Sequence, residues 1–276
     1  MNLFFKMNHH TQKNIISIVY VLVFLGVIYI GPLALGIFFA IISLLGVKEV
    51  HKLSSEQSNK FLAYLGTIIL ILALAVFKLD LVSIETIALL LPIFWLALMS
   101  FSVFMDNKNP LNLAATSITA AIYLPLFLFL TMESAYTSGS WEPGYLLGFL
   151  LTIWLYDKSA YLIGAAMGRT PFVPEISPNK TWEGLAGGSL VAMVVALLFA
   201  YFSDLQNLGF WGGAWFFICI FGTIGDLFES KLKRVSGVKD SGNILPGHGG
   251  ILDRFDSILF SGPVFTGYIY LIQVLF

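Results

Sequence analysis

Long apolar runs, separated by short polar or glycine- and proline-containing segments, extend along most of the chain. A helix needs about 20 mainly apolar residues to cross a bilayer, and most of the runs approach that length. They do not alternate apolar and polar residues, as the strands of a membrane barrel would. The pattern predicts an all-α, polytopic bundle of about nine membrane-spanning helices, at residues 15–30, 32–47, 61–77, 84–105, 111–132, 144–163, 185–203, 210–228 and 258–276.

The composition agrees with a membrane protein. The 276 residues are 58% hydrophobic and 11% charged, and the mean hydropathy is +0.86, well outside the range of soluble domains. A net charge of −1 gives no reason to expect a nucleic-acid partner. The single cysteine excludes a disulfide framework. The basic N-terminal segment leads into an apolar run without a recognisable cleavage site, so we expect an uncleaved first helix.

The distribution of Lys and Arg predicts the orientation. With the N-terminus in the cytoplasm and nine spans, Lys78 falls on the far side of the membrane and every other Lys and Arg falls on the cytoplasmic side. Such an asymmetry is typical of the correct topology of a membrane protein. We therefore expect a cytoplasmic N-terminus and a C-terminus on the opposite side.

Two polar regions, residues 157–184 and 226–257, then share the cytoplasmic side. Asp157, Asp226 and Asp253 stand at the ends of apolar helices, where ionisable groups are costly and often functional. Two carboxylates from different helices would form a hard-oxygen site that suits Mg²⁺. Alternatively, each aspartate caps a helix or pairs with a nearby cation. Three aspartates gathered at one face, beside Lys and Arg, favour a functional site.

The segment "LPGHGG" offers conformational freedom and exposed amides. Gly247, Gly249 and Gly250 permit backbone conformations closed to other residues and can present N–H groups to an anion. The segment is not a Walker loop, and a tight turn explains it equally well. His248 is open to three interpretations: a turn residue, a phosphate donor or an acid.

Basic residues surround these carboxylates. Lys239 and Arg254 lie among the aspartates, where a positive group can offset the charge of a phosphate. Lys231, Lys233 and Arg234 suit the same role, but such clusters next to a membrane also bind anionic lipids.

The segment "SPNKTWEG" (177–184) has the composition of a helix start. Ser177 or Thr181 can cap the following helix, and Glu183 is favoured in its first turn. Lys180, just before a helix N-terminus, fits a phosphate site. Ordinary helix-start chemistry leaves Lys180 unexplained.

Residues 230–256, "SKLKRVSGVKDSGNILPGHGGILDRFD", resemble the signature of the phosphatidate cytidylyltransferase (CDP-diacylglycerol synthase) family. The likeness includes a Ser, Lys-Arg, Lys-Asp, Pro-x-His-Gly-Gly and Asp-Arg-x-Asp at the family spacing. "SPNKTWEG" is similar to a second family block. The chain departs from the family at "DKSAY", where Lys158 and Ser159 replace the usual Thr and Gly.

The resemblance implies a nucleotidyltransferase of phospholipid biosynthesis that condenses CTP with phosphatidic acid from the bilayer, giving CDP-diacylglycerol and pyrophosphate. It implies Mg²⁺, with room for a second cation, held by Asp226 and Asp253. The catalytic residues that it implies are Asp226, Lys239, Asp240, His248, Asp253, Arg254 and Asp256. Those expected to bind CTP and lipid phosphate are Ser177, Lys180, Thr181, Ser230, Lys233, Arg234, Gly249 and Gly250.

The expected organisation follows from this assignment. Residues 1–143 would form spans one to five, and residues 144–276 the catalytic region with cytoplasmic loops 157–184 and 226–257. A bacterial inner membrane with the site facing the cytoplasm is the expected location, and a homodimer is compatible with the resemblance. Two alternatives remain: a cytidylyltransferase that acts on another lipid phosphate, and an ion-coupled transporter. The clustering of charge at one face and the lack of a clear internal repeat disfavour the transporter.

Overall fold

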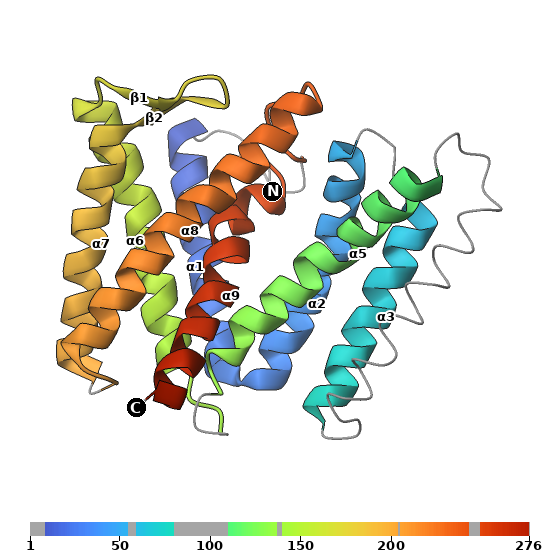
Figure 1. Cartoon of the computed structure of the whole chain (residues 1–276), viewed down its shortest axis with the longest axis horizontal. Coiled ribbons are helices and arrows are strands. Elements are labelled where there is room, and N and C mark those ends of the chain that lie inside the picture. The colour runs from blue at the N-terminus through green and yellow to red at the C-terminus, as the bar shows by residue number, and fades with distance from the viewer. Residues whose placement is uncertain are drawn as a thin grey trace. The chain divides into compact units, whose positions relative to one another are not determined.

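The computed structural model describes residues 9–54, 59–79, 110–136, 140–203, 205–242 and 249–275. The predicted span at 84–105 lies outside these residues. Within them the regular structure is helical apart from one short hairpin (Figure 1), which confirms the all-α prediction. The elements are α1 (His9–Ile30), α2 (Pro32–Leu53), α3 (Lys60–Lys78), α5 (Pro110–Glu133), α6 (Gly144–Met167), β1 (Pro171–Val173), β2 (Ser177–Thr181), α7 (Trp182–Ser203), α8 (Leu208–Val235) and α9 (Leu252–Leu275).

Each of the other predicted apolar runs forms a helix. In the described part of the chain, six helices are long and apolar enough to cross a membrane: α2, α5 from Ala115 onward, and α6 to α9. Shorter apolar helices cover Ile18–Ile30 and Lys60–Ala75. The chain is therefore a helical membrane protein, while the total of nine spans stays a prediction.

Several helices are longer than the apolar runs that predicted them. Helix α6 continues to Met167, α8 continues to Val235, and α9 already begins at Leu252. The extension of α8, residues 229–235, contains Glu, Lys, Leu and Arg, which are good helix formers, so this helix continues after the hydrophobicity ends. Asp157 and Asp226 lie within the predicted runs, and the earlier start of α9 places Asp256 in a helix as well.

The chain forms two compact units. Unit 1 contains residues Met1–Leu126 and Val238–Arg254, and unit 2 contains Phe127–Gly237 and Phe255–Phe276. Helices α5 and α9 have residues in both units. The division of the chain into spans one to five (1–143) and a catalytic transmembrane region of spans six to nine (144–276) stays a prediction.

In unit 1, turn and cap residues fix the helices. Gly31 has φ 127° between α1 and α2, and Pro32 follows at the first position of α2, where its missing N–H costs nothing. Asn59 caps α3 by accepting a hydrogen bond from Leu62 N (3.0 Å), and its own N–H donates to Ser117 Oγ of α5 (2.7 Å). These contacts connect α3 to α5.

The core of unit 2 is aromatic. Phe149 of α6, Trp211 of α8 and Phe265 of α9 are fully buried, with ring centroids 5.3 Å apart for Phe149–Phe265 and 5.8 Å apart for Trp211–Phe265. By contrast, α7 exposes large apolar side chains such as Leu190 and Leu198. A helix with such a surface is suited to lipid contact.

A short antiparallel hairpin, β1–β2, connects α6 to α7 and lies over their adjoining ends (Figure 1). Glu183 holds its base, because its carboxylate accepts hydrogen bonds from Arg169 N, Thr170 N (both 3.1 Å) and Thr170 Oγ1 (2.8 Å). The sequence analysis did not predict this hairpin, since the prolines in residues 171–181 obscure the strand pattern.

Candidate active site

Three carboxyl groups from three helices lie within electrostatic range of one another in unit 2. Asp157 belongs to α6, Asp226 to α8 and Asp256 to α9, and Asp157 interacts with the other two. Asp226 and Asp256 also interact directly. Like charges repel at such range, so a cluster of this kind requires cations or protons to be stable.

A glycine allows α8 and α9 to approach closely at this cluster. A Cβ atom at Gly225 would collide with the Asp256 carbonyl oxygen and lie 3.1 Å from Phe260 Cβ. The backbone of α9 therefore packs directly against α8 one residue before Asp226. This packing places the carboxyl groups of Asp226 and Asp256 near each other.

The hairpin supplies a cation to the cluster. Lys180 Nζ lies 2.5 Å from Asp226 Oδ2, and both side chains are partly accessible. Arg234 Nε donates to the carbonyl oxygen of Ile176 (3.2 Å), which connects the far end of α8 to the same hairpin. Two regions that the sequence analysis identified separately, 157–184 and the start of 226–257, are thus brought together.

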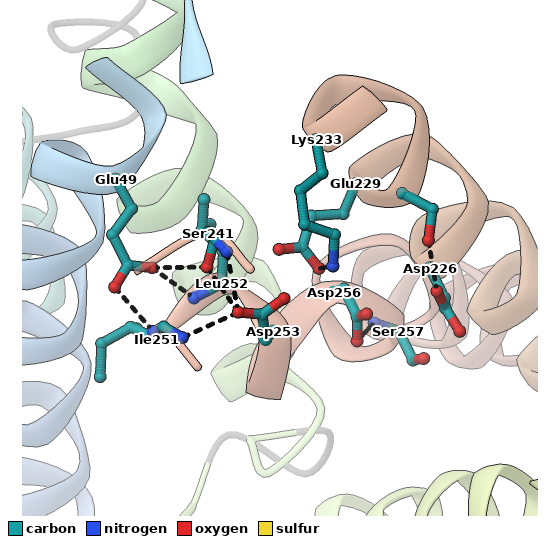
Figure 2. Close-up of polar contacts among 12 residues, drawn as sticks. Glu49, Asp226, Glu229, Lys233, Ser241, Ile251, Leu252, Asp253, Asp256 and Ser257 are labelled. Atoms are coloured by element: carbon teal, nitrogen blue, oxygen red, sulfur yellow. Dashed lines mark hydrogen bonds and ion pairs between the residues drawn. The ribbon is translucent and has the colours of Figure 1, made fainter. Parts of the chain in front are cut away.

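The last turns of α8 contain further polar contacts beside Asp226. Ser230 Oγ donates to Asp226 Oδ1 (3.1 Å), and Lys233 Nζ lies 3.5 Å from Glu229 Oε2 (Figure 2). Glu229 is 1% exposed and Lys233 is 9% exposed, so this pair is shielded from water. Lys231, by contrast, is exposed.

Asp253 lies in unit 1 and is held by the chain around it. Its Oδ2 accepts hydrogen bonds from Ser241 N (3.0 Å), Ser241 Oγ (2.9 Å) and Gly250 N (2.7 Å) (Figure 2). Gly249 has φ 80°, and a Cβ atom there would lie 3.2 Å from Asp253 Cγ. The glycine is therefore required both by its conformation and by the closeness of the carboxylate.

The remaining predicted residues have varied positions. Lys239 and Asp240 are exposed in the segment before Ser241. Thr181 caps α7, since its Oγ1 accepts a hydrogen bond from Gly184 N (3.2 Å), while Ser177 begins β2 and does not serve as the cap. Arg254 is partly buried in the first turn of α9. His248 and Gly247 lie outside the described residues.

Sequence reasoning did not predict a role for two buried acids, Glu49 and Glu229, and did not list Asp157 as catalytic. Glu49 of α2 is 3% exposed and accepts hydrogen bonds from Ile251 N and Leu252 N. It follows the predicted apolar run 32–47, next to Lys48, and nothing in the sequence marks it as buried. Glu229 of α8, which is 1% exposed and paired with Lys233, was not among the predicted site residues. Asp157 was noted at a helix end but was not included among the expected catalytic residues.

The donor chemistry of the unit 2 cluster fits a hard divalent cation. Among the residues that the structure describes, no three His, Cys, Asp or Glu side chains are arranged as a ready metal site. Mg²⁺, however, usually takes one or two carboxylates and fills its other positions with water and substrate phosphates. The partly accessible carboxylate of Asp226, close to those of Asp157 and Asp256, provides oxygen donors of this kind.

Comparison with known proteins gives one consistent result. The model of the cytidylyltransferase family matches residues 11–272. A phosphatidate cytidylyltransferase of Staphylococcus aureus (strain COL) is 37% identical over 268 residues, which cover 95% of this chain and 98% of that protein. The phosphatidate cytidylyltransferase of Staphylococcus haemolyticus is 36% identical over 270 residues, with 95% and 99% covered. The resemblance inferred from the signature residues is thereby confirmed, and the chain belongs to the cytidylyltransferase family of enzymes.

Proposed function

We propose that this protein transfers the cytidylyl group of CTP to phosphatidic acid, producing CDP-diacylglycerol and pyrophosphate. The observation that carries the proposal is the full-length similarity to phosphatidate cytidylyltransferases, 36–37% identical over 95% of the chain. The ion pair between Lys180 and Asp226 supports it, because it brings a cation from the block 177–184 to a carboxylate that lies four residues before the signature 230–256.

In this reaction an oxygen of the lipid phosphate attacks the α-phosphorus of CTP. The bond between the α-phosphorus and the oxygen bridging to the β-phosphate breaks, and pyrophosphate leaves with the electron pair. The nucleophile is already anionic near neutral pH, so the site needs no strong general base. Catalysis then consists of positioning the two phosphates and neutralising their charge.

The basic residues are proposed to position the phosphates and neutralise most of their charge. Lys180 and Lys233 are directed by carboxylates, since Asp226 binds the first and Glu229 the second. They would receive phosphate oxygens of the nucleotide or the lipid. Lys239, Arg254 and the amides of Gly249 and Gly250 are proposed to contact the departing pyrophosphate, with His248 as a further donor.

Mg²⁺ is the proposed metal, and Asp226 and Asp253 are the residues proposed to hold it, with Asp256 close to Asp226 in support. When bound, Mg²⁺ would polarise the α-phosphoryl group and offset the charge of the leaving pyrophosphate. Asp240 is proposed to orient the neighbouring Lys239. Ser177, Thr181, Ser230 and Arg234 are proposed to shape the phosphate-binding region.

We also propose nine spans with the N-terminus in the cytoplasm, a location in the bacterial inner membrane, and a homodimer. The location suits the chemistry, because CTP is a soluble nucleotide of the cytoplasm and phosphatidic acid enters from the bilayer. The Lys and Arg distribution supports the orientation. Light scattering of the purified protein in detergent would measure the oligomeric state.

The proposed reaction is tested with purified protein in detergent micelles. Pyrophosphate release is measured with CTP, Mg²⁺ and phosphatidic acid, and each component is omitted in turn. Release that needs all three, with CDP-diacylglycerol as the second product, is the expected result. A mock purification from host cells that lack the protein measures any contaminating host enzyme. Asp226→Asn should lose nearly all release, and Glu175→Gln, which removes an exposed hairpin carboxylate, controls for the change in charge.

Failure would be equally informative. If folded wild-type protein binds CTP but releases pyrophosphate only with another lipid phosphate, such as a polyprenyl phosphate, the proposed acceptor is wrong. If it neither binds CTP nor releases pyrophosphate, the proposed reaction is wrong as a whole. Micelles hold no ion gradient, so turnover in them also excludes an ion-coupled carrier as the source of the signal.

A further inference from the structure

Glu49 is an acid buried in the half of the chain that the sequence described only as apolar spans. It is 3% exposed near the C-terminal end of α2, whereas its charged neighbours Lys48 and Lys52 are exposed. A buried carboxylate is costly unless it is hydrogen-bonded or paired. Its position therefore calls for an explanation in terms of what it binds.

The carboxylate of Glu49 binds the N-terminus of α9. Its Oε1 accepts a hydrogen bond from Ile251 N (3.0 Å) and its Oε2 accepts one from Leu252 N (2.9 Å) (Figure 2). The first N–H groups of a helix have no partner within the helix and favour negative charge. Glu49 thus caps α9 from a different helix, with all the contacts lying inside unit 1.

The Glu49 carboxylate also accepts a hydrogen bond from Ser241, which precedes α9 in the signature segment. Ser241 Oγ lies 3.0 Å from Glu49 Oε2 and 2.9 Å from Asp253 Oδ2, so this hydroxyl group bridges two carboxylates. Asp253 in turn accepts from Ser241 N and Gly250 N. Glu49 and Asp253 together join Ser241 to residues 250–252.

Glu49 packs so closely against Gly242 and Gly250 that neither position has space for a side chain. A Cβ atom added to Gly242 would lie 2.8 Å from Glu49 Cδ, and one added to Gly250 would lie 2.5 Å from it. Two glycines of the signature segment thus enclose the carboxylate. This is an observation independent of the hydrogen bonds, and it identifies the same contact.

We propose that Glu49 is a positioning residue for nucleotide binding. Its carboxylate holds Ser241 beside the N-terminus of α9 and thereby fixes Lys239 and Asp240 on one side and Arg254 on the other. The inference rests on the proposed function, in which these residues face the phosphates of CTP. It assigns to α2 a role in binding CTP.

Glu49→Gln tests the proposal in the full-length protein. The amide replaces one acceptor oxygen by an N–H₂ group, which faces another donor at Ile251, Leu252 or Ser241. We expect the Kd for CTP to rise about tenfold, as for the loss of a hydrogen bond to a charged group. The KM for phosphatidic acid should change less than about twofold, because a positioning role affects the nucleotide side alone.

Two further variants separate positioning from stability. Ser43→Ala removes a buried hydroxyl group of α2 that bonds only within its helix in the hydrogen bonds described, to Phe39 O, and it should leave both substrate constants unchanged. Ser241→Ala removes the bridging hydroxyl group and should raise the Kd for CTP about threefold. In the double variant with Glu49→Gln, the effects should be less than additive, since the two residues share one contact.

The outcomes distinguish the inference from the proposed function. If the wild type binds and uses CTP but folded Glu49→Gln keeps a wild-type Kd for CTP and loses only kcat, the positioning role is wrong while the proposed function stands. If Glu49→Gln does not fold, Ser241→Ala decides, and an unchanged Kd for CTP in that variant overturns the inference. If the wild type itself neither binds nor uses CTP, the proposed function fails and the inference fails with it.

Discussion

Lys180 Nζ lies 2.5 Å from Asp226 Oδ2, and this ion pair connects the β1–β2 hairpin to α8. The hairpin is itself held by Glu183 at its base and by Arg234 at the end of α8. The lysine is therefore presented to the carboxylate by a structured element. A cation in that position can stay with Asp226 or receive a phosphate oxygen when substrate binds.

Replacing Lys180 by Gln should lower kcat/KM for CTP turnover by about 10- to 100-fold, because a charge-assisted contact to phosphate is lost. Lys231→Gln is the matched control, since Lys231 is an exposed lysine near Asp226 in the chain. It should change kcat/KM less than about twofold if surface charge alone has little effect. Pyrophosphate release under limiting CTP measures both. Equal effects of the two variants would contradict a specific role for Lys180.

Asp226→Asn should abolish at least about 99% of kcat/KM and raise the Mg²⁺ concentration that gives half-maximal activity, because a proposed metal ligand loses its charge. Ser230→Ala removes only the hydroxyl group that donates to Asp226 Oδ1, and a loss of about threefold to tenfold is expected. Mg²⁺ titrations of the two variants and the wild type provide the measurement. An unaltered Mg²⁺ dependence in a folded, partly active Asp226→Asn variant would show that the metal assignment is wrong.

Gly225→Ala should separate α8 from α9, since its Cβ atom would collide with the carbonyl oxygen of Asp256. We expect a loss of about 1–3 kcal/mol in stability from overpacking and at least about a tenfold loss in kcat, because small displacements of catalytic groups are costly. Gly212→Ala, in the same helix, places its Cβ atom in open space and should leave kcat unchanged without lowering stability, since Ala favours a helix over Gly. Thermal unfolding in detergent and pyrophosphate release test the pair. If the two variants had the same stability and kcat, the close packing of α8 against α9 at Gly225 would not be needed for activity.

The apolar pattern predicted the helices well because length and hydropathy are what a bilayer selects. The apolar pattern predicted the polar ends of the helices less accurately. Helix α8 continues beyond Asp226 to Val235, since helix propensity does not depend on hydrophobicity. The hairpin at 171–181 was missed because it is stabilised by contacts such as Glu183 with Thr170 that no local pattern reveals.

The sequence analysis named several residues that the candidate site contains, but their partners came from the fold. Lys180 and Asp226 were both predicted, yet only the structure pairs them. Glu49 lies far from the signature in sequence and was not predicted, because a contact with Ile251 and Leu252 backbone amides leaves no trace in side-chain chemistry. Asp253, proposed as a metal ligand, also proves to have three hydrogen-bond donors from its own segment.

The orientation of unit 2 in the membrane gives a further prediction. Ser140 precedes α6 and Glu175 lies in the hairpin after it, and both are exposed. Helix α6 has 24 residues, or about 36 Å, enough to cross the roughly 30 Å hydrocarbon core. With a cytoplasmic N-terminus and nine spans, position 140 should face away from the cytoplasm and position 175 toward it.

Single cysteines at these positions test the orientation in a background where Cys219, the buried native cysteine, is replaced by Ala. In intact spheroplasts, a membrane-impermeant maleimide should label Ser140→Cys and spare Glu175→Cys. In inverted membrane vesicles the pattern should reverse. The opposite pattern would place the hairpin, with Lys180, on the side that lacks CTP, and the proposed reaction would then be untenable in this orientation. Labelling of both positions from one side would instead mean that α6 does not cross the membrane.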